Sequence, residues 1–312
     1  MNKLKKIGLT ALAASLVTTS AFAAELTATG SASMAVKNNT GSSDTSTGKS
    51  FTMGNSVTFA GSGETDGGLS ISMSFELDSG VDTGTGTGPF DSHSLTVGSD
   101  ALGTLVFAGH GGSSAQGAMD TTAAGDLYDN GLGMTAIAAA RSGDNSMHYT
   151  LPTLMDGVAI TASMAPGGAG TETDTSFGIA YTGVEGLTVK YGQGDGGTIA
   201  LPHESTTMSA SYAISSFTLS ASNTEADKTN AANEEVDSFQ IAYTVSDSMS
   251  ITYGEETYDT VGAAVDEEVE GYGVSYTTGG MTISANAYEG TGALGVSGAK
   301  SERWKLGLAF AF

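Results

Sequence analysis

The chain ends in RWKLGLAFAF, residues 303–312, and large apolar side chains occupy every second position of this tail. They are Trp304, Leu306, Leu308, Phe310 and Phe312. The positions between them hold only basic and small residues, namely Arg303, Lys305, Gly307, Ala309 and Ala311. Because successive residues of a strand point to opposite faces, the tail predicts a strand with one strongly apolar face and one face without apolar bulk.

The same period of two runs through most of the chain, and GLSISMSFELD, residues 68–78, shows it most clearly. Short segments of this kind, separated by clusters of Gly, Asp, Asn, Ser and Thr, are typical of strands and turns. We predict sixteen strands, near residues 25–38, 50–62, 68–79, 91–99, 102–109, 144–152, 157–166, 173–183, 186–194, 205–215, 216–225, 235–246, 248–259, 268–278, 280–290 and 301–312.

The second face of these segments carries Ser, Thr, Gly and Ala, which cannot form the apolar core of a β-sandwich. An apolar face that alternates with a small, polar face is typical of a transmembrane β-barrel. A sheet inside a bilayer must also close on itself, since every backbone N–H and C=O needs a partner there. The sequence therefore predicts an all-β fold, a transmembrane antiparallel β-barrel of about sixteen strands.

The N-terminus resembles an export signal. Three lysines within the first six residues precede an apolar run over residues 7–17, and AFA at residues 21–23 fits a cleavage site. The run is shorter than the roughly 20 apolar residues that span a bilayer. We expect a signal peptide over residues 1–23 and a barrel over residues 24–312, in the outer membrane of a Gram-negative bacterium.

The composition excludes several classes of function. The 312 residues contain no Cys and carry a net charge of −23, which argues against disulfides, thiolate metal sites and nucleic-acid partners. GQGDGG at residues 192–197 lacks the following helix that dinucleotide binding needs. HGGSS at residues 110–114 has no GxSxG nucleophile to accompany it. We expect no enzyme activity, no catalytic residue, no metal site and no cofactor.

The segment RSGDNSMHYTLPTLMDGV, residues 141–158, resembles a motif of the Gram-negative general porins, in particular those of the alphaproteobacteria. The matching positions are Arg141, Asp144, Asn145, Ser146, Tyr149 and Pro152. The chain departs from the motif at His148, where related sequences often carry Arg. The tail resembles the assembly signal of outer-membrane proteins through Lys305, Gly307, Phe310 and Phe312.

The resemblance implies a water-filled channel for passive diffusion of small hydrophilic solutes and ions, built as a homotrimer among outer-membrane lipids. LGTLVFAGHGG, residues 102–112, resembles the porin strand that leads into an inward-folded third loop. The corresponding loop is residues 110–135. Its acids, Asp120, Asp126 and Asp129, become candidates for the pore constriction.

The alternation of faces also assigns charges to the lumen. It turns Lys37, Lys190, Arg303 and Lys305 inward, and His148 with them. Because the first and last strands pair when a barrel closes, we expect one basic patch from Lys37, Arg303 and Lys305. Arg141 is a further candidate for the constriction. Acids outnumber bases in the chain, 34 to 11, so we expect a weak preference for cations.

Two acidic clusters, residues 225–237 and 255–270, are predicted to lie in loops on one side of the barrel. Oxygen-rich loops can bind Ca²⁺, although a solvated anionic rim explains the same residues. A second function also stays open, a structural or adhesive barrel that is plugged and acts through its acidic surface loops. Conduction in a planar bilayer separates a pore from a plugged barrel.

Overall fold

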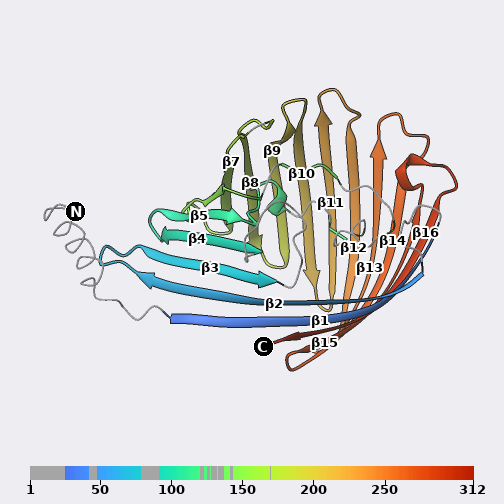
Figure 1. The fold of residues 1–312 in the computed structure, drawn as a ribbon, viewed down its shortest axis with the longest axis horizontal. Coiled ribbons are helices and arrows are strands. Elements are labelled where there is room, and N and C mark those ends of the chain that lie inside the picture. Colours follow the sequence, from blue (N-terminus) through green and yellow to red (C-terminus); the bar gives the residue numbers. More distant parts are fainter. Residues whose placement is uncertain are drawn as a thin grey trace, which may run out of the picture.

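The computed structural model describes residues 25–41, 48–78, 91–119, 123–124, 127, 132, 137–140, 143–168 and 170–312. They form a closed barrel in which each strand pairs with its neighbours in chain order (Figure 1). The strand β1 (Glu25–Gly41) closes the barrel by antiparallel pairing with β16 (Lys300–Ala311). The first described residue is Glu25, so the expected signal peptide, residues 1–23, lies outside the described residues.

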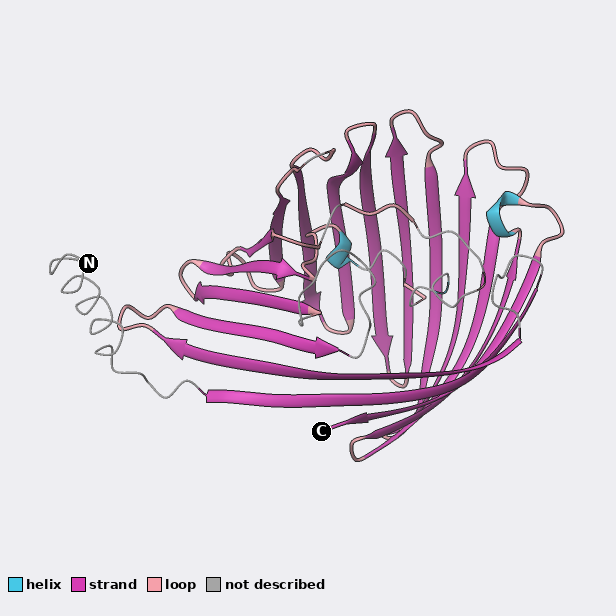
Figure 2. Ribbon diagram, in the orientation of Figure 1, coloured by secondary structure: helices cyan, strands magenta, loops and turns pink. Residues whose placement is uncertain are grey.

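The prediction of sixteen strands and an all-β barrel is confirmed. The strands between the closing pair are β2 (Gly48–Glu64), β3 (Ser70–Asp78), β4 (Ser92–Ser99), β5 (Gly103–His110), β6 (Ser146–Thr150), β7 (Val158–Ala165), β8 (Asp174–Val184), β9 (Leu187–Thr198), β10 (Leu201–Ile214), β11 (Phe217–Lys228), β12 (Glu234–Ser246), β13 (Met249–Thr260), β14 (Glu267–Thr278) and β15 (Met281–Thr291). Among the described residues, two short 3-10 helices, η1 (Gly117–Met119) and η3 (Ala293–Gly295), accompany them (Figure 2). No helix in the described ranges is long and apolar enough to cross a membrane.

The two ends of the barrel differ in their connections. At the end where β1 begins and β16 ends, the chain turns within two residues between β8 and β9, β10 and β11, β12 and β13, and β14 and β15. We call this the turn end. The opposite end, the loop end, carries most of the longer connections, of which the third, residues 111–145 between β5 and β6, is the longest. Loops of this length in a compact fold are usually functional.

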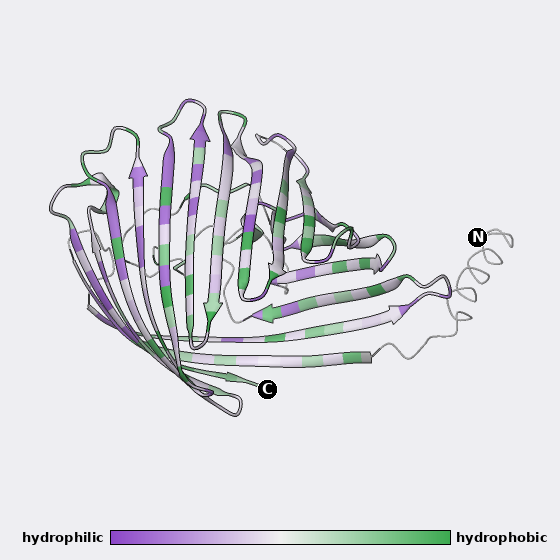
Figure 3. Ribbon diagram, turned by 180° about the vertical axis from the view of Figure 1, so that it is seen from behind, coloured by the Kyte–Doolittle hydropathy of each residue, from purple (hydrophilic) through white to green (hydrophobic). Residues whose placement is uncertain are grey.

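The outer face of the barrel is apolar, as the alternation predicts. Exposed side chains such as Ile71, Phe177 and Leu219 stand at every second position, and Figure 3 shows the bands of hydropathy along the strands. Aromatic residues also pair across neighbouring strands on this face. The ring centroids of Phe217 and Tyr243 lie 4.7 Å apart. Lipid-facing strands of transmembrane barrels have this alternation and such aromatic rows.

The tail completes the barrel in the predicted orientation. Trp304, Leu306 and Phe310 are exposed on the outer face, and Gly307 is buried on the inner one. The backbone of Phe312 bonds in both directions to Gly30, with N–O distances of 2.7 and 3.0 Å. A Cβ on Gly30 would lie only 2.4 Å from the Phe312 ring. Gly30 therefore leaves room for the terminal aromatic ring at the closing seam.

Two details of the prediction are wrong. The strands β9 and β10 were expected to end at 194 and begin at 205, but they continue to Thr198 and from Leu201. Residues 195–197 of GQGDGG were thus expected outside the strands, yet all six residues of this segment are strand positions, and other backbone packs against its glycines. A Cβ on Gly192 would lie 2.9 Å from Cα of Gln116. Glycine is needed where two backbones approach this closely.

The two acidic clusters are also strand residues for the most part. In 225–237 and 255–270, only the connections 229–233 and 261–266 are loops. The alternation continues through both clusters, so the acids Glu225, Glu235 and Glu255 are exposed while their neighbours on the inner face are buried. Charge suggested loops, but carboxylates are tolerated in strands once the outer face extends beyond the apolar belt.

Candidate functional site

The inner face of β8 to β12 is lined by small hydroxyl side chains that are buried. Ser205, Thr207 and Thr224 have no exposed surface at all, and Ser176, Ser222 and Ser238 are less than a tenth exposed. A buried hydroxyl needs a hydrogen-bond partner. Thr224 bonds to Thr207 on the neighbouring strand, and the other five bond to groups of the third connection, residues 111–145.

Backbone amides of this connection donate to side chains of the inner wall, one strand after another. The bonds are Ala115 N to Ser176 Oγ at 2.9 Å, Ala123 N to Ser222 Oγ at 2.8 Å, Ala124 N to Ser238 Oγ at 2.6 Å, and Leu127 N to Glu256 Oε2 at 2.8 Å. An irregular segment has no ladder to satisfy its amides. The serines and Glu256 supply the missing acceptors on β8, β11, β12 and β13.

Side chains of the wall also donate to carbonyls of the same connection. Ser209 Oγ donates to the Met119 carbonyl at 2.6 Å. Ser205 Oγ donates to the Ala138 carbonyl at 2.7 Å, and Gln240 Nε2 donates to the Ala124 carbonyl at 2.9 Å. The described residues of the connection are thus held from both their N–H and their C=O groups.

Gln116 links the wall to the far end of the connection. Its side chain has no exposed surface. Its Nε2 donates to Thr207 Oγ1 at 2.7 Å, and its Oε1 accepts from Ala140 N at 2.8 Å. Because both ends of one amide are used, Gln116 fixes residues 114–119 and 137–140 together against β10.

An apolar cluster inside the barrel strengthens this attachment. Ala124, Leu127 and Leu132 of the connection pack with inward residues of β12 to β14, which are Val236, Tyr258 and Val269. All six are less than a tenth exposed. Burial of a Val or Leu side chain contributes about 1.5–3 kcal/mol. The connection therefore has a small core of its own on the inner wall.

The predicted basic patch lies on the part of the wall between β1 and β16. The register sets Lys37 opposite Lys305 and Asn39 opposite Arg303. Both lysines follow the inward alternation, and Arg303 is 8% exposed. Like charges directly opposite each other on a sheet are destabilising.

The other predicted site residues are scattered. Lys190 lies inward on β9, opposite Ala180 and Ser209, and is remote in strand order from the patch on β1 and β16. His148 lies inward on β6, with Nδ1 3.2 Å from the Ser113 carbonyl. Four further candidates lie outside the described residues: Asp120, Asp126, Asp129 and Arg141.

Sequence reasoning missed the residues that hold the third connection. Glu256 is 1% exposed, and it was counted only as one acid of the cluster 255–270. The alternation could have separated it, because Glu255 faces outward and Glu256 inward. The anchoring serines carry no comparable signal, since Ser and Thr occur along the whole inner face.

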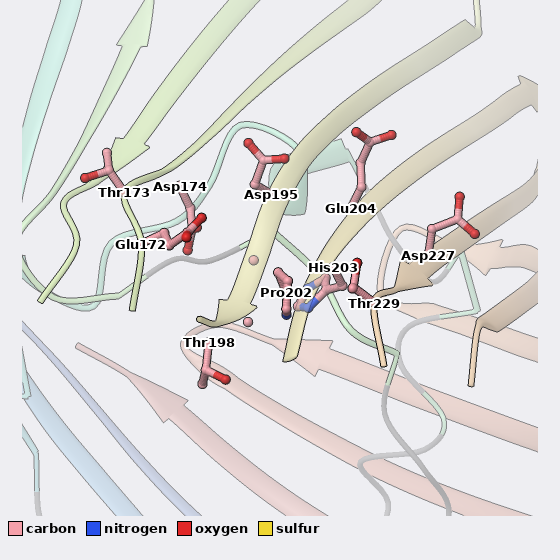
Figure 4. A pocket seen from close by; sticks show the side chains of 12 residues that line it. Glu172, Thr173, Asp174, Asp195, Thr198, Pro202, His203, Glu204, Asp227 and Thr229 are labelled. Atoms are coloured by element: carbon pink, nitrogen blue, oxygen red, sulfur yellow. The ribbon is translucent and has the colours of Figure 1, made fainter. Parts of the chain in front are cut away.

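The loop end also holds an acidic groove of about 410 Å³. Figure 4 shows Asp195, Glu204 and Asp227 side by side on β9, β10 and β11, and the register pairs them in this order. His203 lies below them, and its Nε2 is 2.9 Å from the Ala139 carbonyl. Within the described part of the chain, no three His, Asp or Glu side chains are arranged to hold a metal ion.

A closed antiparallel barrel with an apolar outer face and a polar inner face defines a transmembrane β-barrel protein of the outer-membrane type. Comparison of sequences identifies the family. A model of the Gram-negative porins matches residues 8–312, and the chain belongs to this family. The protein is therefore an outer-membrane porin. No curated protein matches the sequence significantly.

Solved structures share the fold at low sequence identity. The anion-selective porin from Comamonas acidovorans is 15% identical, with a TM-score of 0.70 over 93% of this chain and 100% of that one. OmpT of Vibrio cholerae in its trimer form is 14% identical, with a TM-score of 0.70 over 93% and 100% of the two chains. Salmonella typhi OmpF in complex with daunomycin is 11% identical, with a TM-score of 0.71 over 93% and 98%.

Proposed function

We propose that this porin is a water-filled channel for passive diffusion of small hydrophilic solutes and ions, with a weak preference for cations. The observation that carries the proposal is the inner face of the sixteen-stranded barrel, which is built from small and polar side chains. Barrels of this strand number are wide enough for an aqueous channel. No step of this function needs a catalytic residue or a resident cofactor.

The constriction is the third connection, with residues 110–135 folded inward. Its described residues bond to inward side chains of the wall from Ser163 on β7 to Glu256 on β13. The proposed pore passes between this segment and the wall of β1, β16 and their neighbours. Lys37, Arg303 and Lys305 would then face Asp120, Asp126 and Asp129 across the opening, with Arg141, His148 and Lys190 at its sides.

The proposed ion preference is weak because inward charges of both signs are present. The acids Glu76 and Asp78 follow the inward alternation of β3. The inward residues of opposite charge are Lys37, Lys190 and Lys305. Many acids of 225–237 and 255–270 face outward. They act on the mouth only through a field that fades over about 8–10 Å at physiological salt. The fold alone does not set the sign, because the relative from Comamonas acidovorans is anion-selective.

The mature protein is proposed to be a homotrimer in the outer membrane after cleavage behind Ala23. Trimers are recorded for OmpT of Vibrio cholerae, which shares the fold. Intact mass of the purified protein tests the cleavage site, and light scattering in detergent tests the trimer. If Ca²⁺ occupies 225–237 or 255–270 instead of leaving them solvated, millimolar Ca²⁺ should raise the unfolding temperature where Mg²⁺ does not.

Recording in a planar bilayer tests the proposed channel. We expect stepwise ohmic conductance and, in a KCl gradient, a reversal potential of the sign for cations. Replacing Asp120, Asp126 and Asp129 together by Asn should reduce that potential. Reversal with the opposite sign overturns the cation preference but keeps the channel. Folded protein that inserts without any conductance supports the plugged structural barrel.

A further inference from the structure

The outer face of the barrel has a groove of about 570 Å³ over β14, β15, β16 and the end of β1. Seven of its nine lining residues follow the outward alternation of their strands, so the groove opens toward the surroundings of the barrel. They are Asn38, Thr40, Tyr272, Ala287, Glu289, Glu302 and Trp304. Tyr288 and Arg303, which follow the inward alternation, complete the lining.

The register explains why a groove exists here. Ala287 is directly opposite Tyr272 on one side and Trp304 on the other. Neighbouring strands lie about 4.8 Å apart, so two aromatic residues on either side of one strand are roughly 9.6 Å apart. Ala287 does not fill that interval. Tyr272 is held on its side by Tyr253, with ring centroids 4.9 Å apart.

The groove is polar at one end only. Two residues closer to the loop end, the register sets Glu289 between Glu270 and Glu302. Lys300 Nζ lies 3.7 Å from Glu289 Oε1 at this end. Two residues closer to the turn end, the small side chain of Ala285 lies between the larger ones of Val274 and Leu306. An occupant therefore meets carboxylates, then two aromatic rings, then an apolar surface.

We propose that this groove binds the ammonium headgroup of a membrane lipid, with the acyl chain along β15. Aromatic rings attract cations over their faces, and more strongly when water is displaced. Carboxylates above the rings complement a positive headgroup, and Lys300 can meet its phosphate. Aromatic residues of membrane barrels lie at the level of lipid headgroups. A second copy of the chain fits less well, because it carries a net charge of −23 toward an acidic site.

The chain offers a built-in reporter, since Trp304 is its single tryptophan. The folded protein in micelles of a neutral maltoside detergent is doped with phosphatidylethanolamine or phosphatidylglycerol that carry the same brominated chains. We expect phosphatidylethanolamine to quench Trp304 at about two- to fivefold lower concentration, as an exposed cation–π contact suggests. The double variant Glu289→Gln with Glu302→Gln should lose this preference, and so should Ala287→Leu, which fills the groove without changing charge.

The matched control is Glu225→Gln with Glu235→Gln. These two outward acids are also directly opposite each other, but on β11 and β12, away from the groove. The control should keep the preference for phosphatidylethanolamine. Equal quenching by the two lipids in the unmodified protein overturns the proposal. Loss of the preference in the control, or lack of quenching by either lipid because another copy covers Trp304, overturns it as well. None of these outcomes bears on conduction.

Discussion

Two parts of the inner wall are built from the same kinds of residue and are used differently. On β10 and β11, Thr207 and Thr224 are fully buried: Gln116 of the third connection bonds to Thr207, which bonds to Thr224. On β1 and β2, the inward residues Ser33 and Thr52 are exposed. We call these the covered wall (β7 to β14) and the bare wall (Ser33 on β1 with the inward residues of β2 and β3). The difference shows that a small polar surface can either stay exposed or bind irregular backbone.

The largest change in conductance is expected when the third connection is removed from the covered wall. Deleting residues 115–130 takes away the segment that bonds to the covered wall and should raise unit conductance in planar bilayers. The heat-dependent mobility of the folded barrel on SDS gels serves as the control for folding. A correctly folded deletion variant with unchanged conductance would mean that this segment does not narrow the pore.

Removing one anchor should have a smaller effect. Glu256 accepts from Leu127 N and Ser238 Oγ, so Glu256→Ala leaves buried donors without an acceptor. We expect a loss of about 1–3 kcal/mol in the free energy of unfolding and noisier open-channel current. Glu76→Ala on the bare wall, whose carboxylate accepts from Ser92 Oγ, is the comparison and should change the noise far less. Equal noise in both variants would contradict a specific anchoring role.

A methyl group added at a glycine should have different effects on the two walls. A Cβ on Gly192 would lie 2.7 Å from Cγ of Met119, whereas a Cβ on Gly54 would meet only Ser33 Oγ at 3.1 Å. Gly192→Ala should therefore cost roughly 1–3 kcal/mol, as overpacking does, and Gly54→Ala much less. Denaturant unfolding of the two variants measures the difference. A Gly54→Ala variant that is the less stable of the two would refute the close packing of η1.

The smallest expected effect comes from the basic patch. Lys37→Gln removes one of two opposed lysines and should move the reversal potential in a KCl gradient toward cations. Lys49→Gln removes the same charge from an exposed position opposite Asn38 and should leave the potential unchanged. Equal shifts from the two variants would show that net charge, and not the lumen, sets the potential.

Much of the fold could be predicted because every strand that faces lipid needs apolar residues at alternate positions. In 68–78 and in the tail, apolar residues at alternate positions specify strand, face and membrane together. The covered wall could not be predicted, since Ser176 and Ser33 look alike in sequence although only Ser176 is buried. The predicted strand ended at 194 instead of Thr198 for a related reason. Gly196 in this extension lies against the carbonyl of Ala139, which is distant in the chain.

The covered wall can be tested by one engineered bond, because the chain has no cysteine of its own. A Cβ on Gly254 would lie 2.9 Å from Cβ of Ala124, within reach of a disulfide after a small shift. Ala124→Cys with Gly254→Cys should therefore oxidise completely and keep the unit conductance of the unmodified protein. Ala124→Cys with Gly54→Cys on the bare wall should stay reduced. A bond to Gly54→Cys, or no bond to Gly254→Cys, would contradict the position of the third connection.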